Sequence, residues 1–206
     1  MSDDMFSAPR SLFLRMGFPV HPLTAQGGAG FGPTPRERGG EVTMKGKPVT
    51  LLGIAPEVGE KAPEFAAVDQ EWREVKLSDF AGDVVLLSAV PSLDTPVCSL
   101  QTKRFNEEAS RVPGVQFITI SADLPFAQRR FCSAEGIERM VVLSDHMGYK
   151  FGQAYGVLVK ERNLLARSVF VVRKDGKIAH REIVRELTEH PDYEAALEAA
   201  RKALGK

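Results

Sequence analysis

A continuous apolar run, residues 84–90 (VVLLSAV), is the feature that most constrains the fold of this chain. Such a run is typical of a strand that is buried on both faces of a sheet. In residues 101–111, which follow, apolar residues recur with the spacing of an amphipathic helix. Its apolar side is formed by Leu100, Phe105 and Ala109, and its polar side largely by Lys103, Arg104, Glu107 and Glu108. A buried strand followed by an amphipathic helix is the repeating unit of α/β proteins.

The same alternation continues along the chain. It predicts a strand at 115–121, a helix at 125–135, a strand at 140–143 and a helix at 147–155. Two further strands are expected at 168–173 and 178–184, because the Asp175-Gly176 pair between them is a strong hairpin signal. A last helix is expected at 193–204, after Pro191 and Asp192. The fold class is therefore α/β, with a central sheet and helices on its faces.

The beginning of the chain differs from this pattern. Residues 1–40 contain GGAGFGP and PRERGG and show no helical or strand period, so we interpret them as a flexible extension. Residues 41–206 then form the folded domain. It begins with VTMKGKPVTLLG, which predicts a β-hairpin that turns at residues 45–47.

Charge and hydropathy exclude several classes of function. The 206-residue chain has 27 Lys and Arg against 27 Asp and Glu, so nothing favours nucleic acid or an anionic membrane as a partner. No apolar run reaches the ~18 residues that cross a bilayer. Residues 12–20 (LFLRMGFPV) form a poor signal peptide, because Arg15, Gly17 and Pro19 interrupt them. These observations favour the cytoplasm over the periplasm.

Only two cysteines are present, Cys98 and Cys132. Cys98 closes the segment PSLDTPVC between the buried strand and the following helix, which places it in the first turn of that helix. Ligands bind at this end of an open α/β sheet. The unpaired N–H groups and partial positive charge of a helix N-terminus favour a thiolate over a thiol. The position therefore suits a nucleophilic cysteine.

Three neighbours of Cys98 support this interpretation. Thr95 can place its hydroxyl near the sulfur, and it is also a plausible helix N-cap. Pro91 and Pro96 would stiffen the turn and help to keep water from the sulfur.

These residues carry a resemblance to a known family. Pro91, Thr95 and Cys98 form the pattern P-x-x-x-T-x-x-C, which resembles the active-site motif of peroxiredoxins. The fuller segments PSLDTPVC and SADLPFAQRRFC resemble the bacterial thiol peroxidase branch, of the atypical two-cysteine type. The similarity runs from about residue 41 to the C-terminus.

The resemblance implies roles for individual residues. Cys98 would be the peroxidatic cysteine, Cys132 the resolving cysteine of the same chain, Thr95 the hydroxyl partner and Pro91 a support of the pocket. Arg167, in LLARSVFVV, matches the family's arginine before a late core strand, although the preceding VKERN is shorter than expected. The implied fold is thioredoxin-like with an N-terminal β-hairpin. The implied assembly is a homodimer that thioredoxin reduces, with no metal or organic cofactor.

Sulfur chemistry supplies a mechanism for these roles. A thiolate that attacks the peroxide O–O bond becomes a sulfenic acid, which condenses with a nearby thiol to a disulfide. A disulfide needs Cα atoms within about 4.4 to 6.8 Å of each other, which two helices held by different strands seldom satisfy. We therefore expect local unwinding around one or both cysteines, and separate sulfurs in the reduced protein.

Other functions remain open at this point. The same disulfide could signal to a partner in a peroxide-sensing relay, or could be purely structural. A general thiol-disulfide oxidoreductase is disfavoured, because such enzymes carry C-x-x-C and these cysteines stand 34 positions apart. The four histidines show no ligand spacing with the two cysteines, and we interpret them as structural or solvated; they are His21, His146, His180 and His190. Asp79, Asp83 and Asp94 are interpreted as turn or cap residues and not as a catalytic carboxylate set.

Overall fold

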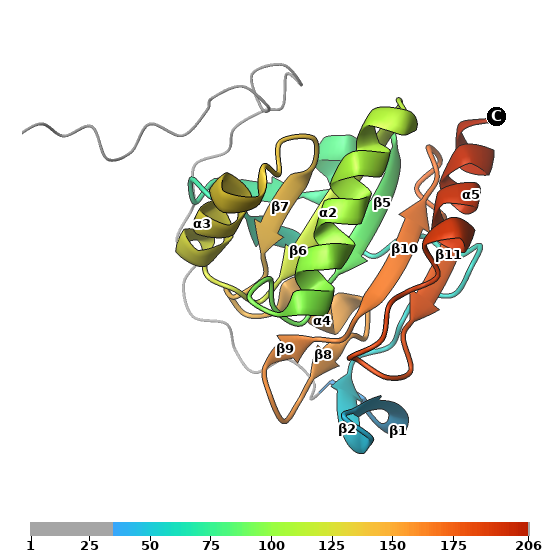
Figure 1. The fold of residues 1–206 in the computed structure, drawn as a ribbon. Coiled ribbons are helices and arrows are strands. Elements are labelled where there is room, and N and C mark those ends of the chain that lie inside the picture. The colour runs from blue at the N-terminus through green and yellow to red at the C-terminus, as the bar shows by residue number, and fades with distance from the viewer. Residues whose placement is uncertain (1–34, 206) are drawn as a thin grey trace, which may run out of the picture.

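The computed structural model describes residues 35–205, which build one large sheet, one small sheet and helices around them. The large sheet has seven strands in the order β11-β10-β5-β6-β7-β3-β4 (Figure 1). Their bounds are β3 Ala66–Val68, β4 Glu74–Lys76, β5 Val84–Ala89, β6 Val115–Ser121, β7 Val141–Ser144, β10 Ser168–Val172 and β11 Ile178–Ile183.

The middle of this sheet is parallel and its edges are antiparallel. Strands β5, β6 and β7 run parallel, whereas β10 and β3 pair antiparallel with β5 and β7. All six residues of β5 are buried, as its continuous apolar run predicts. The prediction of a central sheet is therefore confirmed, and that sheet is mixed.

Three helices cover one face of the sheet (Figure 1). They are α2 (Pro96–Arg111), α3 (Pro125–Glu135) and α5 (Tyr193–Leu204). Because β5, β6 and β7 are neighbours in chain order, two right-handed crossovers in the same direction put α2 and α3 on the same side. Cys98 on α2 and Cys132 on α3 consequently belong to one apolar cluster.

The opposite face is covered by shorter elements. The helix α4 (Lys150–Ala154) and the 3-10 helix η1 (Leu77–Phe80) pack there together with the small sheet. That sheet has the order β1-β2-β8-β9, with β1 Glu37–Met44, β2 Lys47–Leu52, β8 Leu158–Val159 and β9 Leu164–Leu165. The predicted hairpin is β1-β2, and its turn lies at Lys45 and Gly46.

Strand β1 begins earlier than the sequence suggested. It includes residues 37–40, which we had assigned to the flexible extension, because Glu37 and Arg38 pair with Leu52 and Leu51 of β2. The rest of the proposed extension, residues 1–34, lies outside the described residues.

Two details of the predicted helices are wrong. The helix expected at 147–155 begins at Lys150, because Tyr149 takes a left-handed φ of 53° and the carboxylate of Asp145 accepts hydrogen bonds from the amides of Phe151 and Gly152. On α2, Leu100 is exposed while Glu108 is buried. Glu108 tolerates burial because Arg104 and Arg111 pair with its carboxylate at 3.2 and 2.8 Å.

Within residues 35–205, no helix combines the length and the apolar character needed to cross a bilayer.

Candidate active site

The sulfur of Cys98 lies at the start of α2, immediately beyond the carboxyl end of β5. Pro96 occupies the first helical position, where its fixed φ suits a helix start, and Cys98 follows two residues later. The prediction that Cys98 stands in the first turn of a helix after a buried strand is confirmed. Its side chain is completely buried, and Pro91 in the preceding turn is buried too.

A buried arginine provides the polar contact of this sulfur. Arg167 Nη2 lies 3.3 Å from Cys98 Sγ, and the arginine is only 1% exposed. It stands between β9 and β10, so the short segment before it is explained by the tight β8-β9 pair. No carboxylate within the described part of the chain lies at ion-pair distance from this guanidinium. Its positive charge therefore lies beside the sulfur with no carboxylate partner at that distance.

Two further hydrogen bonds fix the guanidinium plane. Arg167 Nη1 donates to Gln101 Oε1 at 2.6 Å, and Nε donates to the carbonyl oxygen of Leu187 at 3.0 Å. Gln101 is itself fully buried and donates to Ser88 Oγ on β5 at 2.8 Å. The guanidinium is thus held from three sides before any substrate arrives.

The sequence reasoning missed Gln101. It lies three residues after Cys98 on the same helix, and therefore on the same helical face. Ser88, its partner, is the lone hydroxyl inside the apolar run of β5. A polar residue one turn after the cysteine, together with a polar residue in an otherwise apolar strand, was the available signal.

Thr95 occupies the N-cap position of α2, as predicted, but its hydroxyl has a different partner from the one we expected. The hydroxyl donates to the carbonyl oxygen of Ser92 at 3.0 Å and makes no capping hydrogen bond. The side chain is exposed, and it is not hydrogen-bonded to Cys98. In this conformation Thr95 stabilises the turn that leads into α2.

A second loop holds that turn in place, and sequence reasoning missed it as well. Asp123 follows β6, and its carboxylate accepts hydrogen bonds from Ser92 Oγ at 2.7 Å and from the amide of Leu93 at 2.8 Å. Ser121 Oγ also donates to it, at 2.8 Å. The loops after two neighbouring parallel strands are thereby tied together beside Cys98.

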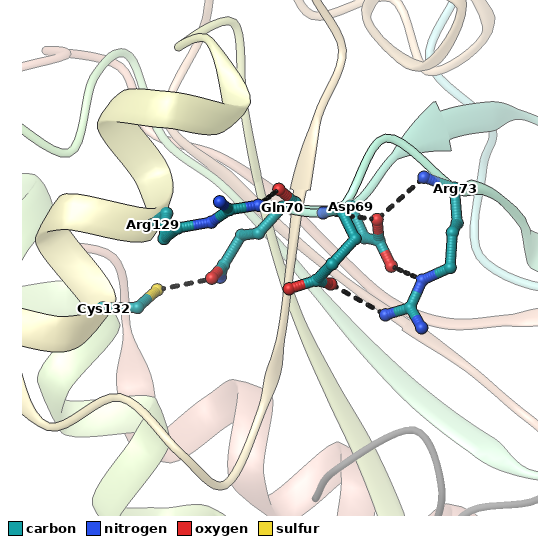
Figure 2. Close-up of polar contacts among 6 residues, drawn as sticks. Asp69, Gln70, Arg73, Arg129 and Cys132 are labelled. Carbon is teal, nitrogen blue, oxygen red and sulfur yellow. Dashed lines mark hydrogen bonds and ion pairs between the residues drawn. The ribbon is translucent and has the colours of Figure 1, made fainter. Parts of the chain in front are cut away.

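Cys132 lies on the buried side of α3 and is 6% exposed. Gln70 Nε2 is 3.2 Å from its sulfur (Figure 2). Burial raises the pKa of this thiol from 9.0 to about 12, and the hydrogen bond from Gln70 opposes the shift only in part. Both cysteines are free thiols, so the expectation of separate sulfurs is confirmed.

Metal-ligating residues do not cluster in the described part of the chain. No three His, Cys, Asp or Glu side chains of residues 35–205 come together as a possible metal site. His146 hydrogen-bonds with Ser144 and His190 with Tyr193, His180 lies on β11, and His21 falls outside the described residues. Asp79 accepts a hydrogen bond from the amide of Lys76 at 2.8 Å, which confirms the interpretation of this residue as a cap.

Comparison with known sequences identifies close relatives. The model of the Redoxin family matches residues 57–197. A thiol peroxidase of Listeria innocua is 55% identical over 163 residues, which are 79% of this chain and 99% of that protein. A thiol peroxidase of Bacillus subtilis is 52% identical over 166 residues, which are 81% of this chain and 99% of that protein.

Solved structures agree with the architecture. A peroxiredoxin-like protein from Aquifex aeolicus superposes with a TM-score of 0.75 at 38% identity, over 80% of this chain and 98% of that one. A thiol peroxidase from Chromobacterium violaceum gives a TM-score of 0.72 at 19% identity, over 80% and 97% of the two chains. The second match supports the fold alone.

Proposed function

The chain belongs to the Redoxin family and is a peroxiredoxin-type thiol peroxidase with a thioredoxin-like fold, and from this premise we propose that Cys98 is its peroxidatic residue and Cys132 its resolving residue. The substrates proposed are hydrogen peroxide and organic hydroperoxides, which are reduced to water and alcohols. The observation that carries the assignment is the Arg167 guanidinium, which lies 3.3 Å from Cys98 Sγ.

In the first step, the thiolate of Cys98 attacks one oxygen of the peroxide. The O–O bond breaks, sulfur loses two electrons, and the other oxygen leaves as water or alcohol after it takes a proton. The products are the Cys98 sulfenic acid and the reduced peroxide. Negative charge moves from sulfur to the leaving oxygen, so a cation already held beside the sulfur stabilises both ends of the reaction. Arg167 has this role, and Gln101 positions it.

Thr95 contributes through a change of partner. Its hydroxyl donates to the Ser92 carbonyl oxygen, and it stands one helical turn before Cys98. An incoming peroxide offers an alternative acceptor of similar strength, so rotation of the hydroxyl exchanges one hydrogen bond for another. The role inherited from the family motif requires the hydroxyl to leave the Ser92 carbonyl oxygen.

In the second step, the thiolate of Cys132 attacks the sulfenic sulfur of Cys98 and displaces hydroxide. An S–S bond forms, the S–O bond breaks, and a dithiol protein, which we propose to be thioredoxin, later returns two electrons and two protons. Buried as it is, Cys132 is almost entirely protonated at neutral pH, because its pKa is raised to about 12. Unwinding of α3 would both bring it within reach and expose it to water, where a thiol ionises more easily.

The homodimer and the cytoplasmic location stay predictions. They follow from the family resemblance and from the sequence, and each has a direct readout in sedimentation and in cell fractionation.

Coupled turnover tests the proposal. Purified protein with thioredoxin, thioredoxin reductase and NADPH should consume cumene hydroperoxide catalytically, and Cys98→Ser should abolish NADPH oxidation. Cys132→Ser should still undergo the first oxidation but leave a sulfenic acid at Cys98. Oxidation of one equivalent without turnover would refute the enzymatic proposal and support a peroxide-sensing relay instead.

A further inference from the structure

One residue of the β3-β4 turn is held by α3 through both its side chain and its backbone (Figure 2). Gln70 Nε2 donates to Cys132 Sγ at 3.2 Å, and Arg129 Nη2 donates to the carbonyl oxygen of Gln70. Arg129 and Cys132 are three residues apart, so they lie on the same face of α3. This pair of contacts joins the helix that carries Cys132 to a turn distant in the sequence.

The turn itself is rigidly built. The carboxylate of Asp69, which is 2% exposed, accepts hydrogen bonds from the amides of Glu71 and Arg73 at 2.9 Å each. It also accepts one from Arg73 Nε at 2.6 Å. Trp72 takes a left-handed φ of 63°, a conformation that a bulky residue adopts only where its surroundings enforce it. Gln70 therefore projects toward α3 from a fixed support.

We propose that Gln70 is a positioning residue that acts on the resolving step through Cys132. Its amide holds the Cys132 thiol in place while α3 is intact, and must release this thiol before the disulfide can form. The proposal rests on the function proposed for Cys132 above. Cys98 belongs to α2 and bonds to Arg167, whereas Gln70 bonds to Cys132 on α3, so the first oxidation does not require Gln70 to move. Release of the Cys132 thiol by Gln70 and formation of the disulfide belong to the same later step.

The consequence is a competition at Cys98. While Cys132 is held, the sulfenic acid at Cys98 persists and can react with a second peroxide, which breaks another O–O bond, oxidises the sulfur to sulfinic acid and leaves as water or alcohol. Once Cys132 is released, disulfide formation removes the sulfenic acid from this reaction. The strength of the Gln70 contact therefore sets the peroxide concentration at which the enzyme inactivates itself.

The chain contains its own reporter of this step. Trp72 is its single tryptophan, and it lies in the same turn as Gln70. Its ring packs edge-on against Phe126, in the first turn of α3, with centroids 5.4 Å apart. Unwinding of α3 changes this contact, so tryptophan fluorescence should follow the release.

The test compares Gln70→Ala and Gln70→Leu with the wild type and with Gln153→Ala. Gln153 lies on α4, is exposed and donates a single side-chain hydrogen bond, to the carbonyl oxygen of Gly148. Gln153→Ala therefore also removes one glutamine hydrogen bond, but on a different helix from Cys132. Reduced protein is mixed with hydrogen peroxide in a stopped-flow instrument, and quenched samples are weighed by intact mass spectrometry. Loss of two hydrogens marks the disulfide, and gain of two oxygens marks the sulfinic acid.

Both Gln70 variants should leave the first, peroxide-dependent phase unchanged and speed the second, peroxide-independent phase by roughly threefold to fivefold, the effect of one modest hydrogen bond. The peroxide concentration that gives half sulfinic acid should rise by the same factor. Gln153→Ala should match the wild type in both measurements. A structural defect alone would not separate the two phases in this way.

Two negative outcomes have different meanings. If the wild type forms the disulfide but both Gln70 variants resolve at its rate or more slowly, the role of Gln70 is refuted while the proposed function stands. If the wild type itself forms no disulfide after one equivalent of peroxide, the resolving role of Cys132 fails, and the proposal for Gln70 fails with it.

Discussion

Arg167 and Cys98 are 69 positions apart in the sequence, yet Nη2 of one lies 3.3 Å from Sγ of the other inside the protein. The arginine reaches the sulfur because β10, which it precedes, pairs with β5, which ends just before the cysteine turn. The first residue of β10, Ser168, is in register with the last residue of β5, Ala89. The pairing of two strands thus brings the cation and the nucleophile together.

Substitution of this arginine should affect chemistry more than binding. Arg167→Lys keeps the positive charge, but its single ammonium nitrogen cannot reproduce the three hydrogen bonds that the guanidinium makes to the sulfur, Gln101 and Leu187. The second-order rate constant for Cys98 oxidation should therefore fall by about a hundredfold. Competition with horseradish peroxidase for hydrogen peroxide measures this constant. A decrease of this rate constant smaller than threefold would show that the planar geometry of the guanidinium does not matter for the reaction.

Gln101→Leu tests the positioning of that arginine. The substitution removes the acceptor of Arg167 Nη1 and the donor to Ser88 Oγ and leaves an apolar side chain of similar bulk. We expect the rate of Cys98 oxidation to fall by roughly tenfold while the rate of disulfide formation stays unchanged, because Gln101 does not contact Cys132. Stopped-flow phases separate the two rates, and an equal loss in both would indicate general damage to the site.

The sequence was sufficient for the strand-turn-helix unit around Cys98, because a continuous apolar run, two prolines and a helical period lie close together in the chain. It was not sufficient for Gln101 and Asp123, whose partners belong to other segments. Local patterns carry no information on which distant segment a polar side chain will meet. Arg167 was found only through the family resemblance, since nothing in LLARSVFVV by itself distinguishes it from a charge at a strand end.

The same limit explains the errors in the elements. Strands β8 and β9 have two residues each and exist because β8 pairs with β2, so no period could have predicted them. The start of α4 was misplaced because it depends on Asp145, five residues upstream of the helix, rather than on helix propensity. Exposure of Leu100 and burial of Glu108 likewise reflect which neighbours cover α2.

Cys132 should be unreactive in the folded protein. With burial raising its pKa to about 12, only roughly one molecule in ten thousand is a thiolate at pH 8. In a Cys98→Ser background, reaction with a disulfide reagent should therefore be at least a hundredfold slower than with free cysteine. It should reach the free rate in urea. Fast labelling without denaturant would mean that α3 is already open in the reduced protein.

The same shift predicts a loss of stability at alkaline pH. The pKa of Cys132 is higher in the folded chain than its ordinary value of 9.0, so its contribution to stability is full below pH 9 and is lost as the pH rises toward 12. Compared with Cys98→Ser/Cys132→Ala, the Cys98→Ser protein should lose up to roughly 1.4 kcal/mol more unfolding free energy per pH unit in that window. If urea denaturation shows the same pH dependence of the unfolding free energy for both variants, the raised pKa of Cys132 is contradicted.

Asp145 should produce the same trend, a loss of stability with rising pH, but in the acidic range and on another element, before α4. Burial raises the pKa of this carboxyl from 3.8 to about 6, against the lowering effect of the amides of Gly152 and Phe151. Because the folded pKa is the higher one, the protonated carboxyl contributes stability that is full below pH 3.8 and is lost as the pH rises through 6.

Asp145→Asn cannot titrate, so its unfolding free energy should lack this decline between pH 4 and 7, whereas the exposed control Asp175→Asn should retain it. Urea denaturation across this range measures the difference, and identical slopes in the wild type and Asp145→Asn would show that the carboxyl keeps an ordinary pKa.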